Sequence, residues 1–312
     1  MAIGKRARAY TIKGMKPFAG VFTPIITPFG SDGAVDEAGM RGNVARWMAT
    51  PLTGLVVLGS NGEAVQLEDA EADWVIEIVR SAMPRDRPLI AGTGRESTAA
   101  TINATRRAAA AGVDAALVRT PSFFTSQMTT EVFVRHYTEV AEASPVPVLL
   151  YNVTAYTGVS LAADAVAILA LHPNIVGLKE SGNDIGLIAE YIARTPDEFT
   201  VLAGSGASLF HALCADCDGV VLALASLAPR EVVSMEALLD QGRLDEARAL
   251  QRRLMPLARS VSAVHGVAGL KAALELMGFA AGPPRPPLRP LSAPAIDLLR
   301  EQLDVLGLLE QA

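Results

Sequence analysis

The sequence predicts an α/β fold, a (β/α)8 TIM barrel with a C-terminal helical extension. Short apolar runs rich in β-branched residues recur along the chain, and helical stretches lie between them. Strands that are apolar throughout and alternate with helices indicate a parallel sheet covered on both faces. Eight such units favour a closed barrel over an open doubly wound sheet, which more often has five or six strands.

The eight predicted strands come at regular intervals. They cover residues 19–22, 55–58, 89–91, 115–118, 147–151, 175–179, 199–203 and 219–222. Predicted helices such as 68–83 and 97–111 lie between them, the second with Ser97 at its start and Gly112 at its end. In such barrels the active site lies at the carboxyl ends of the strands and in the loops that follow, which narrows the search for chemistry.

The strand pattern stops after residue 229, and the remainder is predicted to be helical with a proline-rich break at residues 283–290. We therefore divide the chain into a flexible N-terminal tail (1–17), a barrel (18–229) and a C-terminal helical subdomain (230–312). The basic tail has no apolar core segment, which excludes a standard secretory signal. The chain has no acidic residue before Asp32, so an organelle-targeting peptide stays an alternative to a disordered tail.

The composition excludes several classes of function. Half of the 312 residues are hydrophobic, yet no apolar run reaches the ~18 uninterrupted residues typical of a membrane span. A net charge of -6 with both signs mixed argues against a nucleic-acid surface. Two cysteines cannot form a disulfide framework, so a reducing compartment is the default. We expect a soluble cytoplasmic protein with a small-molecule partner and neither a membrane nor a nucleic-acid partner.

Lys179 is the first candidate for chemistry. The chain has only five lysines among 27 basic residues, and this one closes the predicted strand 175–179. Strand alternation places Lys179 on the same face as Gly177, which leaves room for a substrate or a bulky neighbour. An amine at an apolar barrel mouth loses solvation, which favours the neutral form that attacks a carbonyl. The ordinary alternatives are a pair with Glu180 or a side chain that extends into solvent.

Tyr151 and residues 59–63 (GSNGE) complete the candidate site. Tyr151 ends the strand before that of Lys179, and neighbouring strands lie about 4.8 Å apart, so its phenol could relay protons. The two glycines of GSNGE let backbone N–H groups converge on a substrate carboxylate, and the Ser60 hydroxyl could extend the relay. A packing tyrosine and a plain glycine-rich turn held by Glu63 are the alternatives.

Three segments together resemble one enzyme family. GSNGE at 59–63, YNV at 151–153 and NIVGLKES at 174–181 are similar in order and spacing to the hallmarks of the dihydrodipicolinate synthase and N-acetylneuraminate lyase family of class I aldolases. The resemblance extends over residues 18–300. Members are (β/α)8 barrels, usually tetramers, that form a lysine Schiff base with pyruvate and need no cofactor.

The resemblance implies a role for each residue of the site. Lys179 would be the Schiff-base lysine and Tyr151 the proton-relay phenol. Ser60 and Asn61 would bind the pyruvyl carboxylate, largely through backbone N–H groups. The other expected pocket residues are Gly204 and Val221 around the lysine, and Tyr156 and Ser205 around the aldehyde half of the substrate.

The chain departs from the synthase pattern after the tyrosine motif, where Thr154 also replaces the usual proline, and after the fourth predicted strand. Tyr156 stands where the synthases place an arginine for the carboxylate of the aldehyde substrate, and loss of a bidentate clamp should weaken that substrate's binding. Phe123 and Phe124 stand where the family often has a second tyrosine donated across a subunit interface. With GSNGE at 59–63 and AGTGRES at 91–97, the chain looks most similar to 4-hydroxy-2-oxoglutarate aldolases.

These observations predict a Schiff-base aldolase or lyase that cleaves a 4-hydroxy-2-oxo acid into pyruvate and an aldehyde, as a homo-oligomer (dimer or tetramer). The alternatives in the same class are 4-hydroxy-tetrahydrodipicolinate (dihydrodipicolinate) synthase and an aldolase or dehydratase for sugar-derived oxo acids. A catalytically silent keto-acid-binding barrel is the alternative from another class.

Three further signals are interpreted as unrelated to catalysis. No metal site is predicted, because the four histidines show no ligand spacing. Cys214 and Cys217 have no second cysteine pair, so they are expected to be two reduced thiols on a helix. Lys271 lies in a predicted helix beyond the barrel and is expected at the surface.

Overall fold

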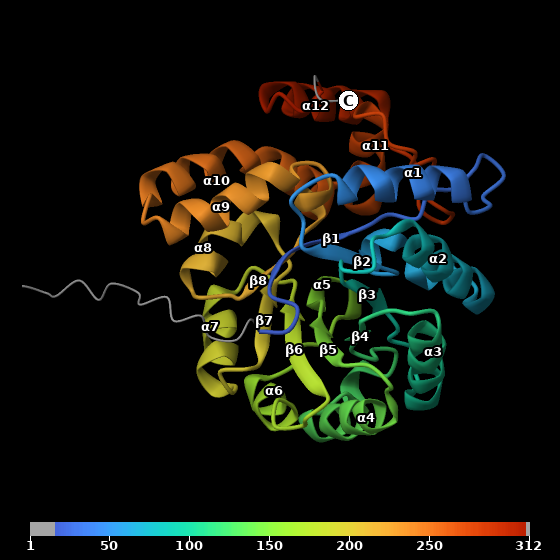
Figure 1. Ribbon diagram of the computed structural model, residues 1–312, viewed down its shortest axis with the longest axis vertical. Helices are drawn as coiled ribbons and strands as arrows, with labels where there is room; N and C mark the ends of the chain where they lie inside the picture. Colours follow the sequence, from blue (N-terminus) through green and yellow to red (C-terminus); the bar gives the residue numbers. More distant parts are fainter. Residues whose placement is uncertain (1–15, 310–312) are drawn as a thin grey trace, which may run out of the picture.

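The structure is a computed structural model that describes residues 16–309. Its parallel strands close into a barrel in the order β1 to β8, each hydrogen-bonded to the next (Figure 1). The strands are β1 (Gly20–Pro24), β2 (Gly54–Val57), β3 (Leu89–Gly92), β4 (Ala115–Arg119), β5 (Val148–Asn152), β6 (Ile175–Glu180), β7 (Thr200–Ala203) and β8 (Gly219–Val221). The predicted TIM barrel is confirmed, and every predicted strand overlaps the observed one.

Helices connect the strands and surround the barrel (Figure 1). They are α1 (Glu37–Met48), α2 (Asp69–Ala82), α3 (Thr98–Ala110), α4 (Thr130–Ala143), α5 (Thr154–Thr157), α6 (Ala163–Leu169), α7 (Ile185–Arg194), α8 (Leu209–Cys214) and α9 (Pro229–Asp240). The predicted boundaries of α3 hold: the Ser97 hydroxyl accepts a hydrogen bond from Ala100 N–H at 3.1 Å, and Gly112 adopts φ 88° just after the end.

The C-terminal part of the described chain is helical, as expected. It contains α10 (Leu244–Arg259), a π-helical segment η6 (Ser260–Val264), α11 (Gly266–Leu276) and α12 (Ala293–Val305). The end of α11 lies beside α1 (Figure 1), where the Arg46 guanidinium donates to the Met277 carbonyl at 2.9 Å. Buried side chains of α9, α10 and α11 share one apolar cluster with the outer face of the barrel.

The division of the chain at residue 230 stays a proposal, because this shared cluster runs across it. Most of the predicted N-terminal tail, residues 1–15, and the targeting peptide considered there lie outside the described residues. Lys16 is described, and its ammonium forms a 2.8 Å ion pair with Asp218 just before β8. Among the helices of residues 16–309, none has both the length and the hydropathy that crossing a bilayer requires.

The barrel interior contains a second, separate apolar cluster. Its members alternate along the strands, as Leu117 does on β4 and as Leu149 and Tyr151 do on β5. Side chains of this kind fill a barrel of this size, so the lumen is a packed core and substrates reach only its mouth. The carboxyl ends of the strands, where Arg119, Tyr151 and Lys179 lie, therefore form the floor of the candidate site.

Candidate active site

Lys179 and Tyr151 lie side by side at the carboxyl end of the barrel. Their Cα atoms are register partners on β6 and β5, and both side chains face the interior. Gly177, two residues before the lysine, leaves no room for substrate, because a Cβ there would lie 2.8 Å from Leu149 Cδ2 and 2.5 Å from the Thr200 carbonyl oxygen. The bulky neighbour is thus Leu149, and the open space lies only above the lysine.

The Lys179 side chain is 4% exposed, and its Nζ lies 4.3 Å from the centre of the Tyr151 ring. Within residues 16–309 no carboxylate forms an ion pair with it. Glu180 points to the other face of the sheet, where Asn152 Nδ2 and Gly182 N–H each donate to it at 2.5 Å. Lys179 therefore neither pairs with Glu180 nor extends into solvent, which were the two ordinary alternatives. A buried amine without a carboxylate partner is rare outside functional sites.

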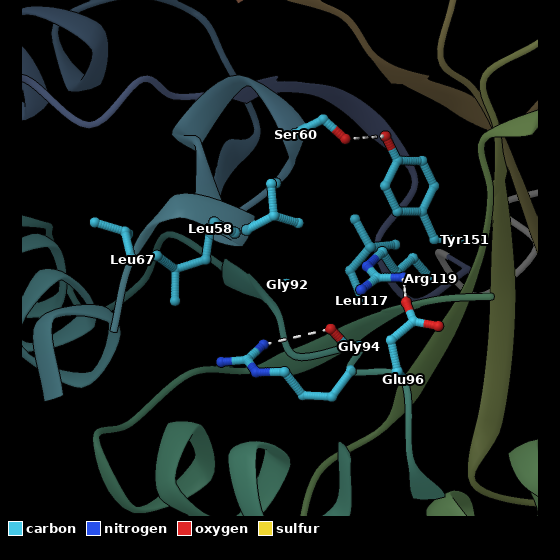
Figure 2. Close-up of a pocket in the computed structure, with 13 residues that line it drawn as sticks. Leu58, Ser60, Leu67, Gly92, Gly94, Glu96, Leu117, Arg119 and Tyr151 are labelled. Carbon is cyan, nitrogen blue, oxygen red and sulfur yellow. Dashed lines mark hydrogen bonds and ion pairs between the residues drawn. The ribbon is translucent and has the colours of Figure 1, made fainter. Parts of the chain in front are cut away.

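The Tyr151 hydroxyl lies 3.2 Å from the Ser60 hydroxyl (Figure 2). Burial alone would raise the pKa of the Tyr151 phenol, but the positive charge of Lys179 and hydrogen bonds with Ser60, Ser181 and Lys179 together lower this pKa below its ordinary value. A phenol of lowered pKa between a lysine and a serine can exchange protons with both. The hydroxyls of Tyr151 and Ser60 and the Lys179 amine are thus arranged as the predicted relay requires.

The loop that carries Ser60 is held in a left-handed conformation at both ends. Leu58 and Glu63 each have φ 55°, a conformation that non-glycine residues adopt at a cost. Gly59 has φ -76° and Gly62 is not left-handed either, so the two left-handed positions of the loop are Leu58 and Glu63 and not its glycines. Residues 60–62 form one 3-10 turn, η1 (Ser60–Gly62). The N–H groups of its first residues, Ser60 and Asn61, have no acceptor inside that turn.

Glu63 fixes this loop to the C-terminal helices. Its Oε1 lies 2.6 Å from Lys271 Nζ on α11, and its Oε2 accepts from Arg285 N–H at 2.8 Å. The Lys271 ammonium also donates to the Pro283 carbonyl at 3.1 Å. Lys271 is 1% exposed, so its predicted surface position is wrong. The prediction failed because the partner, Glu63, lies more than two hundred residues earlier in the chain.

All the predicted site residues line one cavity of about 330 Å³. They are Ser60, Asn61, Tyr151, Tyr156, Lys179, Gly204, Ser205 and Val221. The cavity also includes residues that the sequence analysis missed, among them Ser181, Asn183 and Ser262. Strand alternation could have identified Ser181, because it lies two residues after Lys179 and so faces the same side. Ser262 belongs to η6, and no local pattern links it to the barrel.

The remaining candidates are placed as follows. Phe123 and Phe124 are both exposed and pack edge to face with ring centres 5.1 Å apart. Cys214 ends α8 and Cys217 follows the helix, so only the first is on a helix, and neither forms a disulfide within residues 16–309. Within residues 16–309 no group of three or more His, Cys, Asp or Glu side chains is arranged to hold a metal ion.

Comparisons with known proteins agree with this geometry. The model of the dihydrodipicolinate synthetase family matches residues 17–305. The chain belongs to this family. The 4-hydroxy-tetrahydrodipicolinate synthase of Methanothrix thermoacetophila is 39% identical over 295 residues, 93% of this chain and 99% of that protein. The synthase of an Exiguobacterium species is 36% identical over 89% of this chain and 94% of its own length.

Solved structures of the family superpose closely on this barrel. The dihydrodipicolinate synthase of Acinetobacter baumannii, solved in complex with pyruvate, has a TM-score of 0.89 and is 30% identical, covering 94% of this chain and 100% of that chain. The protein described here is therefore a class I, Schiff-base-forming, pyruvate-dependent lyase. The expected proximity to 4-hydroxy-2-oxoglutarate aldolases is not supported, because the relatives above carry the synthase name.

Proposed function

We propose that Lys179 forms the Schiff base with C2 of pyruvate. The observation that carries this proposal is a buried lysine side chain, without a carboxylate partner among the described residues, at the floor of a 330 Å³ cavity. The amine attacks C2, and the resulting carbinolamine loses water to give an iminium. The iminium withdraws electrons from C3, which loses a proton and becomes the nucleophilic carbon of an enamine. No metal or organic cofactor takes part in these steps.

Tyr151 and Ser60 would move the protons. The phenol lies against the lysine and 3.2 Å from the Ser60 hydroxyl. It can therefore protonate the departing carbinolamine oxygen, and later the alkoxide oxygen that forms when the enamine adds to the aldehyde carbon. The carboxylate of pyruvate would accept hydrogen bonds from the N–H groups of Ser60 and Asn61, which line the same cavity. Gly204, Ser205, Val221 and Tyr156 would shape the remaining walls of the pocket.

The reaction that we propose is addition of the pyruvyl enamine to an aldehyde, as the name 4-hydroxy-tetrahydrodipicolinate synthase describes for the relatives. One observation favours a second candidate, cleavage of a 4-hydroxy-2-oxo acid such as 4-hydroxy-2-oxoglutarate. The uncharged Tyr156 occupies the position at which the synthases have an arginine, and its side chain is 62% exposed at the cavity mouth.

A pair of assays on the purified protein separates the two reactions. The synthase reaction predicts a condensation product when pyruvate and aspartate semialdehyde are supplied together. The cleavage reaction predicts release of pyruvate from 4-hydroxy-2-oxoglutarate, measured with a coupled dehydrogenase. The reaction with the larger kcat/KM is assigned to the enzyme, and failure of both would contradict the proposed chemistry.

Substitution of Tyr151 by phenylalanine tests the relay. We expect kcat to fall by about 10²- to 10⁴-fold, because one acid–base group is lost while the ring remains. The alkaline decrease of the wild-type pH–kcat profile should also disappear. That decrease is expected below the usual tyrosine pKa, since Lys179 and the hydrogen bonds lower the pKa of Tyr151 and a proton-donating phenol is inactive once ionised. A variant with unchanged kcat would contradict the relay.

The assembly and location are also proposals. We propose a homo-oligomer, a dimer or tetramer, that acts in the cytoplasm. The exposed pair Phe123–Phe124 supports the first part, because adjacent exposed aromatic side chains are typical of subunit contacts. A mass measured in solution that corresponds to one chain would contradict it.

A further inference from the structure

Arg119 extends the row of side chains formed by Tyr151 and Lys179. It ends β4 in register with Tyr151, which is in register with Lys179 on β6. Register partners on parallel strands share one face, and Leu117, two residues before Arg119, belongs to the cluster inside the barrel. Arg119 therefore faces the barrel mouth. It lines a cavity of about 250 Å³ together with Ser60 and Tyr151 (Figure 2).

We infer that Arg119 is a specificity-determining residue that binds a carboxylate on the second substrate, the aldehyde that the pyruvyl enamine attacks. The inference rests on the proposed function and names the chemical class of that substrate. It also accounts for the uncharged Tyr156: the positive charge that recognises the aldehyde's carboxylate comes from the end of β4 and not from the loop after β5.

Contacts on three sides hold the Arg119 side chain in place. Its Nη1 lies 2.7 Å from Glu96 Oε1 (Figure 2). The same Nη1 also donates to the Thr120 carbonyl at 3.2 Å. Glu96 is fixed in turn, because its Oε2 accepts the N–H groups of Ser122 and Phe123 at 2.8 and 2.9 Å. A Cβ at Gly94 would lie 2.8 Å from Arg119 Cγ, so a side chain at position 94 would displace the arginine.

The other edge of the guanidinium remains available. Among residues 16–309, Arg119 makes hydrogen bonds only through Nη1, which leaves Nε and Nη2 as donors. The side chain is 22% exposed and also lines a larger cavity of about 890 Å³, which it shares with Tyr156 and Ser60. Two parallel N–H groups on one edge match the two oxygens of a carboxylate and hold it in a defined orientation.

Neither of the other two arginines in these cavities meets the same conditions. Arg95 is occupied, because its Nη2 pairs with Asp69 at 3.0 Å and its Nη1 donates to the Gly94 carbonyl. Arg289 lines only the larger cavity and is exposed. Of the two arginines that share a cavity with Tyr151, Arg119 and not Arg95 keeps both Nε and Nη2 free of hydrogen bonds within the described part of the chain.

Matched pairs of aldehydes test this assignment. Each pair replaces a carboxylate by a methyl group: glyoxylate with acetaldehyde, and 4-oxobutanoate with butanal. Condensation with pyruvate is measured in the wild type and in Arg119→Met, with Arg119→Lys as a second variant that keeps the charge but loses the planar fork. Arg95→Met is the matched control, because it removes an arginine from the same 250 Å³ cavity.

We expect Arg119→Met to lower kcat/KM for the carboxylated aldehydes by about 10²-fold, mainly through KM, and to change the neutral aldehydes by less than about 3-fold. Arg119→Lys should retain part of the preference, and Arg95→Met all of it. An equal loss of kcat/KM for both members of a pair, or no loss, would overturn the inference. The proposed function is tested separately, by reducing the Schiff base between pyruvate and Lys179 with borohydride, and Arg119→Met should leave that trapping intact. Absence of pyruvate trapping in the wild type would overturn the proposed function and this inference with it.

Discussion

Lys179→Met is expected to lower kcat by at least about 10⁴-fold with any pyruvate-dependent substrate pair, because the nucleophile that forms the covalent intermediate is lost. Methionine has a similar length and fills the same space. Lys179 has no carboxylate partner within residues 16–309, so the substitution leaves no unpaired buried charge. The variant should therefore fold, and circular dichroism should give an unchanged helical signal.

A matched control distinguishes lost chemistry from a general effect of losing a lysine. Lys16→Met removes the same type of side chain from the other end of the barrel, where it pairs with Asp218 before β8. It should change kcat by less than about 3-fold, because this partly buried ion pair lies away from the cavity that holds Lys179 and Tyr151. Turnover by Lys179→Met above about one hundredth of the wild-type value would contradict the assignment of the nucleophile.

Lys271→Met is expected to destabilise the fold by about 3–5 kcal/mol, because it leaves the Glu63 carboxylate buried without its cation. The pair has a 2.6 Å separation between Nζ and Oε1, and both side chains are almost fully buried. The Lys271 ammonium also lies 4.1 Å from the Phe29 ring centre. Urea unfolding gives the free energy, with an unchanged m-value as evidence that the same surface is exposed on unfolding.

A double-substitution cycle shows whether the pair itself is responsible. Adding Glu63→Gln to Lys271→Met removes the orphaned charge, so the double variant should recover about half or more of the lost free energy. Because Glu63 anchors the loop that carries Ser60, both single variants should also raise KM for pyruvate. A loss below about 1 kcal/mol, or strictly additive losses, would show that the pair does not hold the loop.

The barrel was predictable because its signals are local. Each strand is an apolar run of a few residues, and its alternation fixes which side chains face inward, as for Tyr151 and Lys179. Because all the strands run parallel, their carboxyl ends lie at the same mouth of the barrel. The site residues therefore converge on one cavity although they come from five different strand–loop connections. Gly204 and Val221 follow this rule at the ends of β7 and β8.

The features that were missed depend on contacts between distant segments. Lys271 has no local signal for burial. Its partner Glu63 adopts a left-handed conformation, which the sequence would assign to a neighbouring glycine instead. Ser262 reaches the cavity from the π-helical segment η6, whose position depends on how α10 and α11 pack. Arg119 is the instructive case, because alternation predicts its inward direction but not that Glu96 orients its guanidinium.

Reductive trapping tests the central claim most directly. The wild-type protein is incubated with pyruvate, reduced with borohydride, digested and analysed by mass spectrometry. We expect the mass of the reduced pyruvyl group on the peptide that contains Lys179, at close to one per chain, and no label on Lys16 or Lys271. A label on another lysine, or an unmodified Lys179 peptide under saturating pyruvate, would contradict the account.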